Sequence, residues 1–342
     1  MAKSLLVLGG SHFLGKAVAE EALLRSWEVT VFNRGRTGSN PDGVTALRGD
    51  RTNEADLERL AALGSWDAVV DTSGMTAEAV EAAARVLLSS TSRYVYVSTV
   101  SVYAGWPLVP LSEDHPTLTE APPATGMPKD VNVPYGVDKA RCEAAARRHL
   151  GERLTILRPG VILGPHEYVG RLPWWLRRIE RGGSILAPGR PDQQIQPVDV
   201  RDVAQFACHR VEAATTSEVF NVAAPNTHTT MEGLLRACLE VVQPKTASLE
   251  WVDSEFLLDR EVKQWTEVPL WRTYPGTWQV SGERAHNAGL ACRPLSETVA
   301  DTWVWMSDGG SAVEHERASL HGLDAVKETA LLDAWRADLR HS

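Results

Sequence analysis

The sequence predicts a doubly wound parallel α/β domain followed by a smaller C-terminal lobe. Short apolar runs alternate with amphipathic stretches, a glycine-rich turn closes the first run, and the alternation weakens after Gly164. Strands that alternate with helices of this length form parallel sheets. Expected strands cover residues 5–8, 28–32, 68–71, 94–98, 154–157 and 219–223, and expected helices cover residues 14–26, 54–63, 77–88, 135–150 and 199–211.

Each element rests on a local pattern. Residues 5–8 are continuously apolar, as in a strand that is buried on both faces. Apolar residues then recur at helical spacing over residues 14–26, and the same two patterns repeat as far as residue 98. A loop rich in proline and threonine, residues 106–134, precedes the helix at 135–150. The strands at 154–157 and 219–223 complete the expected sheet, and the helix at 199–211 lies between them in sequence.

The change in pattern after Gly164 sets the expected domain boundaries. We expect residues 1–165 and 196–224 to form the larger domain. Residues 166–195 and 225–342 should form the lobe, which ends in an amphipathic helix near residues 323–339.

Composition excludes several classes of protein. The 342 residues carry a formal net charge of -9 without any basic block, which argues against a nucleic-acid partner. The four cysteines are widely spaced, as in proteins of a reducing compartment. No apolar run reaches the length of about 18 residues that spans a bilayer, and the N-terminal run is too short for a secretory signal. We therefore expect a cytoplasmic protein with no membrane partner.

A glycine-rich loop joins the first expected strand to the first expected helix. Glycines at such a turn let backbone N–H groups approach a pyrophosphate, which the helix N-terminus then stabilises. The alternative is a tight turn that binds no ligand. The loop predicts a dinucleotide-binding domain of the Rossmann type, with contacts from Gly9, Ser11, His12, Phe13, Leu14 and Gly15.

The end of the second expected strand bears on the choice of cofactor. NAD enzymes usually place an acid there, whereas this chain has Asn33, Arg34 and Arg36. Because arginine binds phosphate bidentately, these residues favour NADP(H), with NAD(H) as the alternative. Both arginines could instead merely solubilise an exposed loop. Asp50, next to Arg51, is expected to bond the adenine amino group, and we include both in the cofactor site.

Tyr135 and Lys139 are four residues apart, so they share one face of the expected helix. A nearby ammonium stabilises a phenolate and lowers the tyrosine pKa, which suits proton transfer to a substrate oxygen. Upstream, the strand at 94–98 ends in the hydroxyls of Ser98, Thr99 and Ser101. Parallel sheets bind ligands at the carboxyl ends of their strands, so these hydroxyls should face the cofactor. Ordinary capping of a strand end is the alternative.

This combination resembles the extended short-chain dehydrogenases, also called the NAD-dependent epimerase/dehydratase family, over most of residues 3–225. The resemblance implies that Thr99 hydrogen-bonds the reacting oxygen and that Tyr135 exchanges the proton. It also implies that Lys139 lowers the pKa of Tyr135 and holds the nicotinamide ribose. The motifs that match are the glycine loop, Ser98-Thr99, Tyr135 with Lys139, Leu157-Arg158-Pro159-Gly160, Gly164-Pro165 and 198–204. Thr72, Ser73, Gly74 and Pro159 match family segments beside the cofactor.

Departures from the family pattern narrow the subgroup. His12 replaces the middle glycine of the loop, as in the atypical branch of the family. Dehydratases follow the catalytic threonine with Asp-Glu, but Val100 and Ser101 follow here, and neither can move the required proton. Sugar-nucleotide epimerases typically have an asparagine at Val161 and an arginine at Ile195. A diphosphate would lack these fixed partners here.

Twelve tryptophans and ten histidines give weaker signals. Most tryptophans are packing residues, and the better pocket candidates are Trp174, Trp271 and Trp278. With Ser101 and Val161 they form the expected substrate site. The histidines show no metal-ligand spacing, so we expect no metal.

The sequence therefore predicts an enzyme that moves a hydride between NADP(H) or NAD(H) and a small organic carbonyl or alcohol. One alternative is an epimerase that retains its cofactor through the cycle. Another is a non-catalytic member that binds a dinucleotide or RNA, as chloroplast proteins of the atypical branch do. The intact set of Thr99, Tyr135 and Lys139 argues against that alternative. The sequence leaves open whether the protein forms a homodimer.

Overall fold

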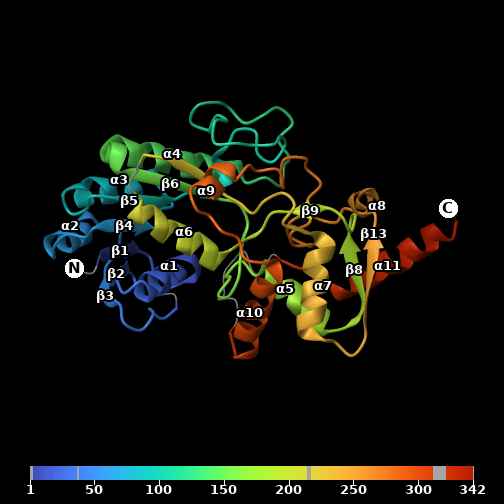
Figure 1. Cartoon of the computed structure of the whole chain (residues 1–342). Coiled ribbons are helices and arrows are strands. Elements are labelled where there is room, and N and C mark those ends of the chain that lie inside the picture. Colours follow the sequence, from blue (N-terminus) through green and yellow to red (C-terminus); the bar gives the residue numbers. More distant parts are fainter. Residues whose placement is uncertain (1–2, 37, 214–216, 311–320, 342) are drawn as a thin grey trace. The chain divides into compact units, whose positions relative to one another are not determined.

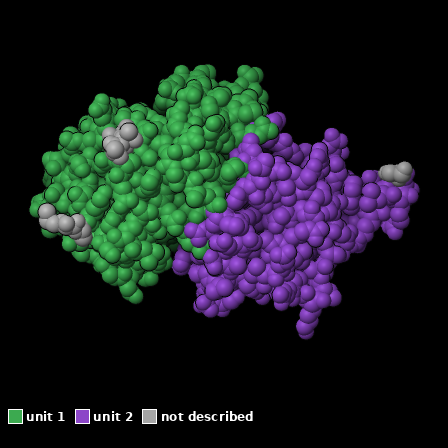
Figure 2. Space-filling view, viewed as in Figure 1, with its two compact units in different colours: residues 1–162, 198–225, 279–292 green, residues 163–197, 226–278, 293–342 purple. Residues whose placement is uncertain are grey.

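The computed structural model describes residues 3–36, 38–213, 217–310 and 321–341. The chain divides into two compact units (Figure 2). The first contains residues 1–162, 198–225 and 279–292, and the second contains residues 163–197, 226–278 and 293–342. The segment 279–292 thus belongs to the first unit, whereas we had placed it in the lobe.

A seven-stranded parallel sheet forms the centre of the first unit (Figure 1), in the order β11-β6-β5-β4-β1-β2-β3. The four apolar residues that end β1, Leu5 to Leu8, are completely buried, as the continuous apolar run predicted. The strands are β1 (Ser4–Leu8), β2 (Glu28–Asn33), β3 (Thr45–Arg48), β4 (Ala68–Asp71), β5 (Tyr94–Val97), β6 (Leu154–Pro159) and β11 (Val219–Val222).

Helices cover both faces of this sheet. On one face α1 packs against α6, and on the other α3 packs against α2 and α4 (Figure 1). The predicted doubly wound fold is confirmed. The helices of this unit are α1 (Phe13–Leu24), α2 (Glu54–Ala62), α3 (Ala77–Val86), α4 (Val133–Leu150), α6 (Val200–Glu212) and α9 (Glu283–Asn287), and its 3₁₀ turns are 87–89, 100–102 and 151–153.

Helix α4 begins two residues before the predicted start. The side chain of Asn132 caps it by accepting a hydrogen bond of 3.1 Å from the backbone N–H of Tyr135. Pro134 lies in the first turn, where its missing N–H leaves no helical bond unmade. The capping asparagine and the proline therefore fix the position of Tyr135 in the first turn of α4.

The second unit contains a two-stranded parallel sheet of β8 and β13 with helices around it. Strand β8 is not predicted by the sequence, because its flanking glycines and its terminal proline are typical of a loop. The C-terminal helix is present as α11, whose Glu328 forms a buried ion pair with Arg178 of α5. The elements are α5 (Arg171–Glu180), β8 (Gly183–Pro188), β9 (Gln194–Ile195), β12 (Thr229–Thr230), α7 (Met231–Val242), β13 (Ala247–Val252), α8 (Ser254–Asp259), α10 (Leu295–Ser307) and α11 (Ala325–Leu339). The remaining short strands of the chain are β7 (Ile162–Leu163) and β10 (Val198–Asp199).

Candidate cofactor and active site

The turn between β1 and α1 requires glycine at three positions. Gly9 (φ +117°) and Gly10 (φ +91°) adopt backbone conformations that favour glycine. A Cβ atom on Gly10 would lie 2.7 Å from the Val31 side chain, and one on Gly15 would lie 2.6 Å from the backbone nitrogen of Gly10. The loop therefore packs closely only because these side chains are missing, and a glycine turn of this kind lets its backbone approach a pyrophosphate.

The residue that replaces the family's middle glycine fits the loop without backbone strain. His12 precedes the first turn of α1 with φ −152° and ψ 143°, an extended conformation that any residue adopts. Phe13, by contrast, has φ +38°, which is uncommon for a residue with a side chain. Ser11 and Leu14 are buried beside them.

The segment after β4 is tied to the end of β1. The hydroxyls of Thr72 and Ser73 both donate to the carbonyl oxygen of Leu8, at 3.2 and 3.0 Å. Gly74 follows, and a Cβ atom there would lie 2.8 Å from the ring of Tyr96. These contacts place Thr72, Ser73 and Gly74 at the carboxyl ends of the strands, where we expected cofactor contacts.

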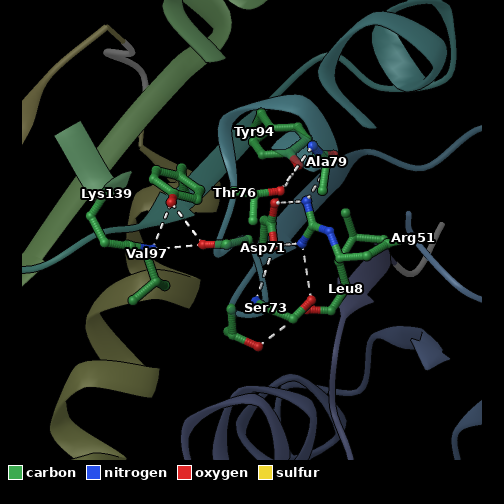
Figure 3. Close-up of polar contacts among 12 residues, drawn as sticks. Leu8, Arg51, Asp71, Ser73, Thr76, Ala79, Tyr94, Val97 and Lys139 are labelled. Atoms are coloured by element: carbon green, nitrogen blue, oxygen red, sulfur yellow. Dashed lines mark hydrogen bonds and ion pairs between the residues drawn. The ribbon is translucent and has the colours of Figure 1, made fainter. Parts of the chain in front are cut away.

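Arg51 forms a buried ion pair with Asp71, the last residue of β4 (Figure 3). Its guanidinium binds both carboxylate oxygens and also donates to Ser73 Oγ at 3.0 Å. The Tyr94 hydroxyl donates to Asp71 Oδ2 at 2.8 Å. Burial opposes the charge of Asp71, but the Arg51 cation and these hydrogen bonds hold the pKa of that carboxyl below its usual value. The positive charge of Arg51 is thus neutralised mainly by Asp71 of the protein itself.

The Asn33 amide connects the glycine loop to the loop that carries the arginines. Its nitrogen donates to Gly9 O at 3.1 Å and to Asn40 Oδ1 at 2.9 Å. Its oxygen accepts from the backbone N–H of Gly35 at 2.9 Å and from Arg48 at 2.7 Å. Asn33 therefore shapes the site through its contacts with both loops.

Three arginines gather at the carboxyl ends of β2 and β3. Arg34, Arg36 and Arg48 are all exposed. Asp50 accepts from the backbone N–H and the hydroxyl of Thr52, at 2.9 and 2.7 Å. These bonds, with the attraction of Arg34 and Arg36, hold the pKa of Asp50 below its usual value. The attraction indicates that both cations lie near Asp50.

The hydroxyls after β5 have different surroundings. Ser98 is 5% exposed, and its Oγ has no hydrogen-bond partner among the described residues. Thr99 Oγ1 accepts from the backbone N–H of Ser101 at 3.2 Å and donates to Ser101 Oγ at 3.3 Å. Thr99 therefore caps the turn that follows β5, which is the ordinary role that we kept as an alternative. Its half-buried hydroxyl still lies at the end of the strand.

Lys139 is buried, and its ammonium donates three hydrogen bonds to oxygens of the protein (Figure 3). The acceptors are Gly74 O at 2.8 Å, Tyr96 Oη at 2.6 Å and Val97 O at 2.8 Å. Burial lowers the pKa of Lys139 to about 8. Tyr135, one turn earlier on α4, is half-buried. A hydrogen bond from this ammonium to a ribose would have to replace one of its three hydrogen bonds to Gly74, Tyr96 and Val97.

The expected substrate residues are distributed between the two units. Ser101 and Val161, both half-buried, lie in the first unit, as does the buried Pro159. The second unit carries the half-buried Trp174 and two buried tryptophans, Trp271 and Trp278. The indole of Trp271 is completely buried and donates to Ser254 Oγ at 3.2 Å, which favours a packing role for it.

Three residues near the site are not among the site residues that the sequence predicts. Asp71 ends an expected strand, but nothing in its neighbours in sequence indicates the pairing with Arg51. Tyr96 alternates with apolar residues and reads as an ordinary core tyrosine. Arg48 is the one of the three that the sequence could have indicated as a site residue, because it ends a strand beside Arg34 and Arg36.

No cluster of three or more histidine, cysteine, aspartate or glutamate residues suited to a metal ion occurs in the part of the chain that the structure describes. Within the same described ranges, no helix has both the length and the apolar character of a membrane span.

Solved structures share this fold. The chain is 18% identical to the Bordetella bronchiseptica enzyme WbmG in complex with NAD and UDP, covering 91% of this chain and 96% of that one, with a TM-score of 0.68. It is 19% identical to the UDP-glucose 4-epimerase of Thermotoga maritima with UDP-glucose, covering 90% and 99%, with a TM-score of 0.64. At these identities the likeness establishes the fold alone.

A curated relative is the chloroplast stem-loop binding protein of 41 kDa b from Arabidopsis thaliana, which is 25% identical over 252 residues. The match covers 69% of this chain and 62% of that protein's length.

The family model of the NAD dependent epimerase/dehydratase family matches residues 5–223. This range contains the glycine loop, the ends of β4 and β5, and the first turns of α4. The resemblance found in the sequence is confirmed, and the chain belongs to the NAD-dependent epimerase/dehydratase family.

Proposed function

We propose that this protein is an oxidoreductase that transfers a hydride between a nicotinamide dinucleotide and the oxygen-bearing carbon of a small organic carbonyl or alcohol. The observation that carries the proposal is the position of Lys139. Its buried ammonium is fixed at the carboxyl ends of β4 and β5. Lys139 itself follows Tyr135 by one helical turn on α4. A lysine held there serves proton transfer by a tyrosine on the same helix face.

The residues of the first unit suit a dinucleotide. Gly9, Gly10 and Gly15 form a turn that a Cβ atom would fill, and the buried Ser98 Oγ has no partner among the described residues. When bound, the nicotinamide ring supplies or accepts the hydride. The protein's own residues would bind, orient and exchange the proton.

Three side chains would handle the substrate oxygen. Thr99 would hydrogen-bond that oxygen and orient it. Tyr135 Oη would give it a proton during reduction and take the proton back during oxidation. The Lys139 cation would stabilise the phenolate form of Tyr135 and so lower its pKa. We propose that the second unit, with Trp174 and Trp278, selects the substrate.

We further propose a preference for NADP(H). No acid stands directly after β2, and Arg34, Arg36 and Arg48 instead place three exposed cations at the ends of β2 and β3. Guanidinium groups match the geometry and charge of a 2′-phosphate. NAD(H) would lose these contacts and bind more weakly.

The second candidate is an epimerase that oxidises and re-reduces its substrate with the cofactor retained. The family match and the epimerase among the similar structures favour it. Val161 and Ile195 disfavour a sugar-nucleotide substrate, because neither offers a hydrogen bond to it. Such an epimerase would purify with bound nucleotide and show no net turnover of added NADPH.

The test is the oxidation of NADPH and NADH by the purified protein against a panel of small carbonyl compounds, with Tyr135→Phe as the control. We expect turnover that falls by about 100-fold or more in the variant, the usual contribution of a general acid. Equal rates for the two proteins would overturn the proposal. Tight bound nucleotide without net turnover would support the epimerase.

A further inference from the structure

The ammonium of Lys139 has three N–H bonds, and the protein itself provides an acceptor for each. Two acceptors are backbone carbonyls, of Gly74 and Val97, each 2.8 Å away. The third is the phenol oxygen of Tyr96 on β5, at 2.6 Å. The phenol makes the shortest of these contacts, and it is the one that a conservative substitution can remove.

Tyr96 is well suited to accept a hydrogen bond. It is completely buried, and its hydroxyl donates to Gly74 O at 2.9 Å. Burial raises the pKa of Tyr96, so it remains a neutral phenol. Because its proton is directed at Gly74, its oxygen can accept a hydrogen bond from Lys139. The Cys142 thiol also hydrogen-bonds this hydroxyl. The ammonium also lies 4.4 Å from the centroid of the Tyr96 ring, within range of a cation–π attraction.

The other charged and titratable groups around Lys139 are paired or neutral. Asp71 on β4 is bound by Arg51, which follows β3. Glu143 on α4 forms a buried bidentate ion pair with Arg158, at 2.9 and 2.6 Å. Burial raises the pKa of the Cys142 thiol, which favours its neutral form. Among the described residues, the ammonium donates to the oxygens of Gly74, Tyr96 and Val97.

We propose that Tyr96 is a positioning residue for the active site: its phenol oxygen, with the carbonyls of Gly74 and Val97, holds the ammonium of Lys139, the residue one helical turn after Tyr135 on α4. The contact is a property of the folded chain. Only its effect on catalysis rests on the function proposed above.

Removal of the Tyr96 hydroxyl leaves one N–H of a buried cation without an acceptor. The charged form of a buried amine then becomes less favourable, so the pKa falls. A hydrogen bond to a charged group is worth enough to move a pKa by about one unit or more. The Tyr96→Phe variant keeps the ring, and with it most of the packing.

The same strand provides a matched control. Tyr94 lies two residues earlier on β5, and it is likewise completely buried. The Tyr94 hydroxyl donates to Asp71 Oδ2 at 2.8 Å. The bond from Lys139 goes to the Tyr96 hydroxyl instead. Tyr94→Phe therefore removes a buried hydroxyl from β5 while all three bonds of Lys139 remain.

The experiment is the pH titration of the full chain labelled with ¹⁵N at lysine Nζ, followed by NMR. The chain contains seven lysines, and Lys139→Met assigns the signal of interest. We expect a midpoint near pH 8 for Lys139. It should fall by about one unit or more in Tyr96→Phe and stay within a few tenths in Tyr94→Phe. No shift in folded Tyr96→Phe, or the same shift in both variants, would overturn the proposal.

A measurement on the unaltered protein keeps the proposal testable even if Tyr96→Phe does not fold. The short contact predicts nuclear Overhauser effects between the ammonium protons of Lys139 and the ring protons of Tyr96. Their absence, with the ammonium protons observed, would contradict it. Both measurements are independent of turnover, so they stand whether or not a carbonyl substrate is found. If a substrate is turned over, the basic limb of the pH profile of kcat/KM should shift in Tyr96→Phe to the same extent as the titration midpoint of Lys139.

Discussion

The carboxylate of Asp71 lies completely buried against the guanidinium of Arg51, which binds both of its oxygens. This pair joins the end of β4 to the segment after β3. Through Ser73 it also reaches the carbonyl of Leu8, directly before the glycine loop. This ion pair therefore connects the segments after β3 and β4 that we expect to contact the cofactor.

Asp71→Asn should destabilise the protein by about 3–5 kcal/mol, because it leaves a buried guanidinium without its counter-ion. Equilibrium unfolding in urea measures this loss. As a control, Arg190→Gln breaks an exposed ion pair with Asp192, and it should change the stability by about 0.5 kcal/mol or less. Equal effects of the two substitutions would show that the buried pair has no special role.

The stabilising contribution of Asp71 should depend on pH. Its pKa is lower in the folded chain than in the unfolded one, so the contribution is complete above the unfolded pKa, near 4. It is lost as the pH falls through the folded pKa. The difference in unfolding free energy between wild type and Asp71→Asn should therefore shrink on acidification below about pH 4. A constant difference down to pH 2 would contradict this assignment.

Lys139 should produce a basic limb in the pH profile of turnover. Its pKa is about 8 in the folded chain, against an ordinary value of 10.5, so its charge is lost above about pH 8. Under the proposed function, Tyr135 then loses the cation that stabilises its phenolate, and kcat/KM should fall. Lys139→Met should lower turnover by about 100-fold or more at pH 7, by analogy with the loss of acid–base assistance.

The stability of the wild-type protein should change in the opposite direction over the same range. Between about pH 8 and 10.5 the unfolded chain binds the Lys139 proton more tightly than the folded chain does. Stability relative to Lys139→Met should therefore rise with pH in this window. Thermal or urea unfolding at several pH values measures the slope, and a negative slope would contradict the assigned direction.

Cofactor preference should depend on the exposed arginines. Replacing Arg34 and Arg36 by glutamine should weaken NADPH binding by about 10- to 100-fold, the value of one or two charge-assisted hydrogen bonds. NADH binding should change little, because that cofactor has no 2′-phosphate. Fluorescence titration of both nucleotides measures the ratio, with Arg236→Gln, an exposed arginine of α7 in the second unit, as the control. A parallel loss for both nucleotides would argue that the arginines shape the loop instead.

Gly15→Ala should weaken the binding of both nucleotides by at least about tenfold, because the added methyl group forces the loop apart. Its Cβ would lie 2.6 Å from the backbone nitrogen of Gly10 and 2.8 Å from Thr72 Oγ1. Overpacking of this kind costs about 1–3 kcal/mol of stability. Titration and urea unfolding on the same samples separate the two effects, and unchanged affinity would show that the loop does not contact the cofactor.

Much of the fold followed from local patterns. The buried run before Gly9 and the alternation of strands and helices predicted the sheet, since each depends on a few neighbouring residues. Strand β8 was missed because Gly183 and Pro188 at its ends are typical of loops. Its pairing with β13, a distant segment, stabilises it as a strand. Tertiary contact, rather than local preference, decides the conformation there.

The candidate site was predictable in its residue types and less so in its partners. The spacing of Tyr135 and Lys139 is local, because four residues make one helical turn. The acceptors of Lys139 are not local: Tyr96 is 43 residues away and Gly74 is 65 residues away in sequence. The link between Arg51 and Asp71 spans 20 residues. Such contacts depend on which strands become neighbours in the sheet.

The amide of Asn33 has a consequence for any redesign of this protein. One side chain steadies both the loop expected to face the phosphates and the loop expected to face the adenosine ribose. A substitution that opens the ribose end to another nucleotide therefore also disturbs the phosphate end. Exchange of nucleotide preference should require compensating changes on both sides of Asn33, selected together rather than one position at a time.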